Sequence, residues 1–222
     1  MEKVYIEEKY IPEYVGDMLS GLKCGTEQVS NTNAKFHHNT DYEQVPSVIK
    51  YGILSLQELN KLGLKNYSEK LLKLMSNIDS HVNGDTGISL SVTGLEDLYL
   101  DEDEFNPTDM YVTDILVSSE VKAARISINY GNEYVAQDRI APDMFRAVDI
   151  RLLNYLKAII EKGSRVGFQN IEGLVMRYNY LRSMAIALQE NKLQVPFREM
   201  SEGNDVLDID KVAKVPTLVI KK

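Results

Sequence analysis

Polar and apolar residues alternate with a period of two through the middle of the chain. Residues 87–93 (GISLSVT) place three aliphatic side chains opposite three hydroxyl side chains, which is the pattern of a half-buried strand. Residues 123–130 repeat this alternation, and Gly131 and Asn132 then supply the two residues typical of a tight hairpin turn. The sequence predicts strands at 34–38, 87–93, 110–119, 123–130, 133–140, 146–150 and 215–220.

Apolar residues return at helical spacing on both sides of these strands. The segment 1–23 contains a helix that starts near Pro12, since four of its apolar residues share one face. Further helices are expected at 43–51, where Gly52 closes the end, at 56–76 with a break near Gly63, and through most of 151–222. Central strands with flanking helices indicate a single α+β domain over 1–222, with a predominantly antiparallel sheet.

Composition narrows the class of protein without identifying its chemistry. The 222 residues carry a net charge of -8, which is atypical of a broad nucleic-acid-binding face. The single cysteine, Cys24, excludes an internal disulfide and a multi-cysteine zinc site. No apolar run approaches the roughly 18 residues that span a bilayer, and the acidic first residues lack a signal-peptide pattern. We therefore expect a cytoplasmic protein without a membrane segment.

Two familiar metal-binding patterns are incomplete in this sequence. His37 and His38 are adjacent on a predicted strand, so they point to opposite faces, and His81 adds no zinc-protease spacing. The acidic run at 101–104 lacks the glycine that a calcium-binding loop requires at its sixth position, because Asn106 stands there. No glycine-rich phosphate-binding loop is present either. We therefore expect no metal cofactor.

Three short segments gain meaning when they are considered together. The first is FHHNT (36–40), followed by a helix and VIKYGIL (48–54); the second is ISLSVT (88–93); the third is NEYVAQDRIAPDMFRAVDI (132–150). Separately, they are a strand end, a polar sheet face and a hairpin glutamate. Their order and spacing resemble the ADP-ribosyltransferase family over roughly residues 34–150.

The family resemblance combines motifs that usually belong to two subclasses. One subclass opens with an aromatic-His-x-Thr type motif and the other with an arginine, and the second strand carries a tyrosine or a Ser-x-Ser motif. This chain joins a histidine to Ser89 and Ser91, and Gly131 stands two residues before Glu133, where arginine-modifying members carry Glu or Gln. The resemblance implies a split, predominantly antiparallel sheet of ADP-ribosyltransferase type in 34–150 and a mostly helical C-terminal part in 151–222.

The resemblance also implies roles for individual residues in NAD chemistry. Glu133 would stabilise the cation that forms when nicotinamide leaves the ribose, and Ser89 and Ser91 would position Glu133 or that ribose through hydroxyl groups. His38, which stands two residues before Thr40 as the motif requires, would bind the adenosine-side ribose together with Thr40.

The remaining NAD contacts are less specific in the sequence. An aromatic wall for nicotinamide is expected from Tyr42, Tyr67 or Tyr99, which sequence does not separate. Arg125 could contact a phosphate of NAD, although a surface ion pair is the commoner role of such an arginine.

The implied function is transfer of ADP-ribose from NAD to a macromolecule, a protein sooner than a nucleic acid, as in a bacterial or phage effector or toxin. NAD would be a substrate in this reaction. The mixed motif set leaves two alternatives open: a non-catalytic module that binds a nucleotide or a partner protein, and an enzyme that processes 2'-phosphates on RNA.

Overall fold

The computed structural model describes residues 2–26, 33–65, 85–92, 112–126, 133–162, 168–200 and 204–221. The predicted loop at 98–109, the turn at 131–132 and residues 66–76 of a predicted helix lie outside these ranges. No helix within the described ranges is long and apolar enough to cross a membrane.

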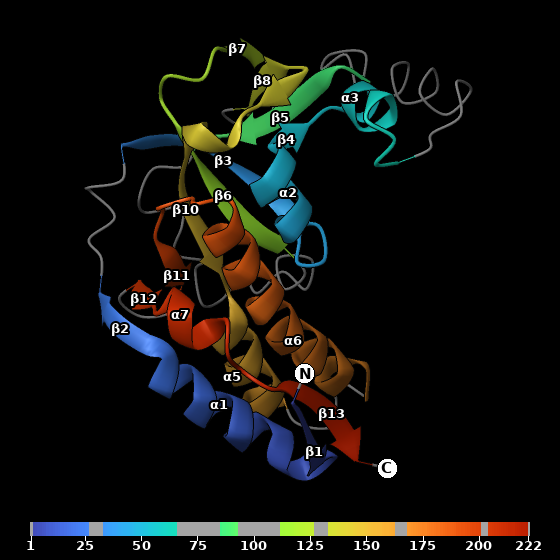
Figure 1. The fold of residues 1–222 in the computed structure, drawn as a ribbon, viewed down its shortest axis with the longest axis vertical. Coiled ribbons are helices and arrows are strands. Elements are labelled where there is room, and N and C mark those ends of the chain that lie inside the picture. The colour runs from blue at the N-terminus through green and yellow to red at the C-terminus, as the bar shows by residue number, and fades with distance from the viewer. Residues whose placement is uncertain are drawn as a thin grey trace.

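A nine-stranded sheet forms the centre of the molecule (Figure 1). Its strands are β2 (Lys23–Thr26), β3 (Ala34–Asp41), β5 (Gly87–Ser91), β6 (Val112–Ser118), β7 (Ala123–Ile126), β8 (Glu133–Gln137), β10 (Phe145–Ile150), β11 (Phe197–Glu199) and β12 (Asp205–Leu207). They lie in the order β2-β12-β11-β10-β6-β3-β5-β8-β7. β10 and β11 pair in parallel, and the other neighbours pair antiparallel. The expected α+β class with a mostly antiparallel sheet is therefore confirmed.

Two small sheets and a set of helices complete the described fold. The small sheets pair β1 (Lys3–Glu7) with β13 (Thr217–Lys221) in parallel, and β4 (Ile53–Leu54) with β9 (Arg139–Ile140) antiparallel. The α-helices are α1 (Ile11–Leu22), α2 (Val45–Tyr51), α3 (Leu56–Lys61), α5 (Leu152–Lys162), α6 (Phe168–Glu190) and α7 (Ile209–Val212). Short 3-10 turns occur at η1 (Glu8–Tyr10) and η4 (Pro142–Met144).

The structure contains strands that the sequence pattern did not predict: β1, β2, β4, β11 and β12. β2, β4, β11 and β12 are at most four residues long, too short for a visible alternation, and β11 is buried on both faces. β1 alternates in burial, but it lies in the segment 1–23, where only a helix was expected. The predicted strand 133–140 divides into β8 and β9 at Asp138, whose φ of 60° interrupts extended backbone. Residues 151–222 therefore supply two strands of the central sheet as well as helices.

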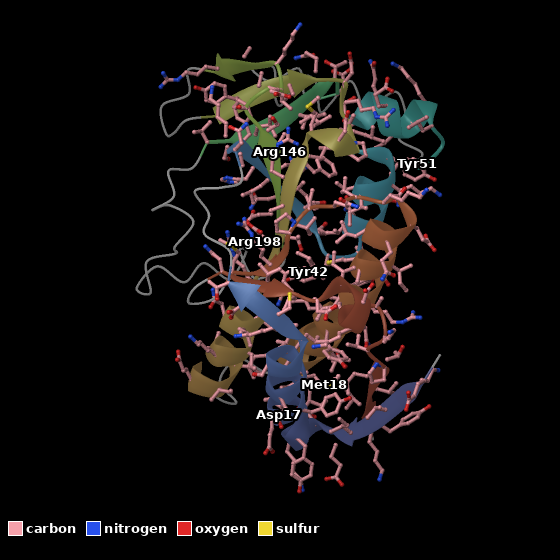
Figure 2. All side chains as sticks on the ribbon, turned by 60° about the vertical axis from the view of Figure 1, so that its left-hand side comes forward. Asp17, Met18, Tyr42, Tyr51, Arg146 and Arg198 are labelled. Carbon is pink, nitrogen blue, oxygen red and sulfur yellow. The ribbon has the colours of Figure 1, made fainter. Side chains whose placement is uncertain are left out.

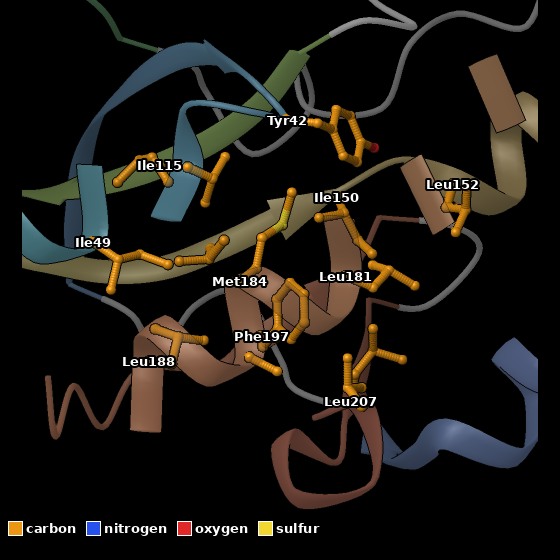
Figure 3. Close-up of a cluster of buried hydrophobic side chains, with 14 of the residues drawn as sticks. Tyr42, Ile49, Ile115, Ile150, Leu152, Leu181, Met184, Leu188, Phe197 and Leu207 are labelled. Carbon is orange, nitrogen blue, oxygen red and sulfur yellow. The ribbon is translucent and has the colours of Figure 1, made fainter. Parts of the chain in front are cut away.

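The hydrophobic core lies between one face of the central sheet and helices α2 and α6 (Figure 3). Phe36, Ile115 and Val148 alternate onto this face from β3, β6 and β10. Leu181 and Met184 of α6 are fully buried against them. Burying a side chain of this size contributes roughly 1.5–3 kcal/mol, so this face is the main source of stability.

Two backbone segments come close together where α2 ends. Gly52 has φ 90°, and a Cβ built on it would lie 2.2 Å from the carbonyl oxygen of Ile140 in β9. Gly63 also has positive φ, 66°, but a Cβ there would meet no atom within 4 Å. An alanine at Gly63 would therefore meet backbone strain alone, whereas an alanine at Gly52 would meet both backbone strain and a steric clash.

We expect Gly52→Ala to destabilise the protein more than Gly63→Ala. The Gly63 substitution costs about 1 kcal/mol of backbone strain, whereas Gly52→Ala adds about 1–3 kcal/mol because β4 and β9 must separate. Chemical denaturation of the two variants measures the difference. Equal losses of stability would contradict the close contact between Gly52 and β9.

A buried carboxyl group holds the first turn of α5 against the sheet. Glu199 of β11 is fully buried and accepts hydrogen bonds from the backbone N–H groups of Leu152 (3.1 Å) and Leu153 (2.8 Å). These bonds satisfy donors that a helix start leaves unpaired. Burial raises the pKa of Glu199 to about 8 against the opposing effect of both bonds.

We expect Glu199 to make stability fall as the pH rises from about 6 to about 8. In this window the folded protein keeps a proton that the unfolded chain has released, so the loss reaches about 1.4 kcal/mol per pH unit. Denaturation as a function of pH should show a flatter slope for Glu199→Gln, and an unchanged slope for the exposed-site control Glu13→Gln. A wild-type slope in Glu199→Gln would refute this assignment.

Candidate functional site

The FHHNT motif, the two serines and Glu133 lie on three adjacent strands. β3, β5 and β8 are consecutive neighbours in the sheet (Figure 1). His37 pairs with Ser91 across β3 and β5, and Ser91 pairs with Glu133 across β5 and β8. Residues almost one hundred positions apart in the sequence thus lie side by side across three strands. We call His37, Ser91 and Glu133 the register row.

Strand register assigns His37 and Ser91 to the same face of the sheet. Residues directly opposite each other on antiparallel strands point to one side. Ser89 stands two residues before Ser91 and shares that side, and both serines are exposed. The backbone of Glu133 occupies the next position in the row, and its side chain lies outside the described part of the structure.

The same face continues with polar residues toward the centre of the sheet. Asn39 pairs with Asp114, Asp114 with Asp149, and Asp149 with Arg198, across β3, β6, β10 and β11. We call this side of the sheet the polar face; its members are His37, Asn39, Ser89, Ser91, Asp114, Asp149 and Arg198. The opposite face carries the hydrophobic core.

Two ion pairs neutralise the buried charges of the polar face. Arg198, labelled in Figure 2, lies in the middle part of the molecule. Its guanidinium donates to both carboxylate oxygens of Asp149, at 2.7 and 2.8 Å, and both residues are fully buried. Burial raises the pKa of Asp149 to about 6, against the opposing effect of Arg198. Arg151, which follows β10 directly, donates to the buried carboxylate of Asp114. Arg151 keeps 12% of its side chain exposed.

His37 is a neutral hydrogen-bonding group on the polar face. Its pKa is lowered, first by burial and then by the positive charge of Arg151. A neutral imidazole provides one N–H donor and one nitrogen acceptor, which suits contact with a hydroxyl group. His37 and the exposed serines therefore offer hydroxyl-binding chemistry from adjacent strands.

His38 lies on the other side of β3 and connects β3 to β5 through a hydrogen bond. Its Nδ1 lies 3.0 Å from the carbonyl oxygen of Ser89. A carbonyl oxygen only accepts, so Nδ1 carries the hydrogen in this bond. The pKa of His38 is lowered by burial, although the bond to Ser89 opposes that effect. Within the described ranges β3 and β5 share one residue pair, His37 with Ser91. The hydrogen bond from His38 to the Ser89 carbonyl is therefore an additional connection between the two strands.

The structure places Thr40 and Tyr42 in the protein interior. Thr40 is 7% exposed and pairs with Thr113, on the same side of β3 as His38. Tyr42 is 4% exposed, its hydroxyl accepts a hydrogen bond from the backbone N–H of Arg151, and the Arg177 guanidinium lies 5.2 Å from its ring centre. Neither residue joins the polar face.

Arg125 is exposed on β7, at the end of the sheet, and pairs with Tyr134. Tyr134 is the residue after Glu133, so Tyr134 and its partner Arg125 point to the opposite side of the sheet from Ser91. Tyr67, Tyr99 and His81 and the acidic run at 101–104 lie outside the described residues. Over the ranges given above, no group of three or more metal-ligating side chains comes together.

Sequence inspection missed the charged residues of the polar face, although a signal was present. Asp114 and Asp149 each interrupt an apolar strand, VTDILVS and FRAVDI. A carboxylate in such a strand is costly to bury without a cation, so a partner had to exist. Its identity could not be deduced, because Arg151 and Arg198 meet these acids only through the sheet register.

Two surface hollows of the described residues lie away from the polar face. One, of about 610 Å³, is lined by Glu7, Lys9, Pro12, Ile171 and Lys221. Another, of about 480 Å³, lies beside α6 and β13 and includes Met176 and Tyr180. Both are at the end of the molecule where β1 and β13 pair, opposite to β5 and β8 (Figure 1).

Comparisons of the chain with protein-family models, with curated proteins and with solved structures found no match.

Proposed function

We propose that this protein transfers ADP-ribose from NAD to a macromolecular acceptor, on a sheet of the ADP-ribosyltransferase type. The observation that carries the proposal is the register row His37, Ser91 and Glu133 on three adjacent strands. The resemblance selected these segments from the sequence alone, and a different strand order would have separated them.

The joint between β3 and β5 supports the fold part of the proposal. A single residue pair connects these strands within the described ranges, so β5, β8 and β7 form a group nearly separate from the rest of the sheet. This arrangement is what a split sheet requires. The backbone around His37 and Ser91 lies at the split.

The chemistry of the row suits cleavage of the bond between nicotinamide and ribose. As that bond breaks, positive charge develops on the ribose and nicotinamide leaves as a neutral molecule. A carboxylate at Glu133 would stabilise this charge in the transition state more than in bound NAD, which is the condition for catalysis. A nucleophile of the acceptor then bonds to the ribose carbon and loses its proton.

The proposal assigns the ribose contact of the first motif to His37 and gives His38 a structural part. His37 shares a face with Ser89 and Ser91, whereas His38 is bound to the backbone of Ser89. The two serines would hold ribose hydroxyls or the Glu133 carboxylate. Thr40 and Tyr42 are buried away from this face, so neither belongs to the proposed site.

Nicotinamide release from NAD by wild-type protein and by Glu133→Gln tests the proposal. We expect at least about a 100-fold loss of rate in the variant, because one charge-stabilising group is removed. Glu13→Gln, an exposed substitution in α1, is the matched control and should keep the wild-type rate. Labelled NAD incubated with a cell lysate reports the class of acceptor.

Equal rates for wild type and Glu133→Gln, with both proteins folded, would overturn the assignment of Glu133. Binding of NAD without any nicotinamide release, in the presence of lysate, would favour a non-catalytic nucleotide-binding module.

A further inference from the structure

The proposed NAD site needs a positive charge as well as hydrogen-bonding groups. The diphosphate of NAD is anionic, and a partly buried anion without a cation is unfavourable. His37, Ser89 and Ser91 supply hydroxyl-binding chemistry and no charge. Arg125, the arginine expected from the sequence, alternates away from their face. Lys35 of β3 extends its ammonium over the rings of Phe36 and Tyr134, at 5.1 and 5.4 Å from their centres, on the side of the hydrophobic core. We therefore consider a cation from another element.

Arg151 reaches the polar face from the end of β10. Its guanidinium pairs with Asp114 of β6, and Asp114 pairs in register with Asn39. Asn39 is two residues from His37 on the same side of β3. The row that contains Asn39 and Asp114 is therefore about 7 Å from the row that contains His37 and Ser91, at 3.3–3.4 Å per residue. Three strand spacings of about 4.8 Å separate β6 from β8, a span that an extended dinucleotide covers.

The structure holds Arg151 at both ends and leaves part of it accessible. Its backbone N–H donates to the Tyr42 hydroxyl at 3.2 Å, and its guanidinium donates to Asp114, which is 1% exposed. A guanidinium has five N–H donors in a planar fork, more than one carboxylate oxygen accepts. With 12% of its side chain exposed, Arg151 is both desolvated and reachable.

We infer that Arg151 binds the diphosphate of NAD, as a cation contributed to the polar face from beyond the three motif strands. This inference rests on the proposed function for the position of the ribose groups. A purely structural role for the Arg151–Asp114 pair is the competing explanation.

Calorimetric titration of the full chain with ADP-ribose and with adenosine, which has no phosphate, tests this role. The informative comparison is Asp114→Asn against Asp114→Asn/Arg151→Gln, because the two proteins differ only at Arg151 and neither leaves a buried carboxylate without its cation. Arg146→Gln, which removes the ion-paired arginine within β10, is the control for loss of charge. Thermal unfolding verifies that each variant is folded.

We expect Asp114→Asn to bind ADP-ribose and the double variant to bind it about 10–100-fold more weakly, the effect of losing a charge-assisted contact. Adenosine affinity should be the same in both proteins. Arg146→Gln should bind ADP-ribose as wild type does. Arg151→Lys keeps the charge but not the fork, and it should show an intermediate affinity.

Equal ADP-ribose affinity in Asp114→Asn and in the double variant would overturn the inference. If the double variant does not fold, Asp114→Asn/Arg151→Met replaces it, because methionine is uncharged and has no polar group to leave unpaired; ADP-ribose affinity equal to that of Asp114→Asn would then overturn the inference. Loss of binding in the double variant, with no nicotinamide release by wild type, would refute the transferase and retain the diphosphate contact. Absence of ADP-ribose binding by wild type would refute both.

Discussion

The joint between β3 and β5 is the constraint on which the rest of the molecule depends. Within the part of the chain that the structure describes, the residue pair His37 with Ser91 joins the two strands, and the His38 side chain adds a hydrogen bond to the Ser89 carbonyl. Two adjacent residues of β3 therefore have different roles: His37 points to the polar face, and His38 is hydrogen-bonded to the backbone of β5. A second connection, between β4 and β9, depends on the close approach of Gly52 to Ile140.

The two faces of the central sheet divide stability from chemistry. The apolar face binds α2 and α6 and carries the core, while the polar face collects charged and hydroxyl side chains from β3, β5, β6, β10 and β11. Buried ion pairs such as Asp149 with Arg198 contribute little net stability, because desolvation offsets their attraction.

The sequence predicted much of the fold because its long elements follow simple periods. The alternation in 87–93 and the helical spacing before Gly52 lead directly to β5 and α2. It could not predict β11 or β12, which are three residues long and depend on pairing with distant strands. The shared face of Ser89 and Ser91 follows from alternation for the same reason, but which of His37 and His38 shares that face, and the position of Arg151, depend on register.

Backbone amide chemical shifts during titration with ADP-ribose would show whether the row across β3, β5 and β8 is a nucleotide site. Saturable shift changes are expected to concentrate at His37, Ser91 and Glu133 and to extend to Arg151. Shifts confined to the hollow beside α6 and β13, or no shifts at all, would contradict it.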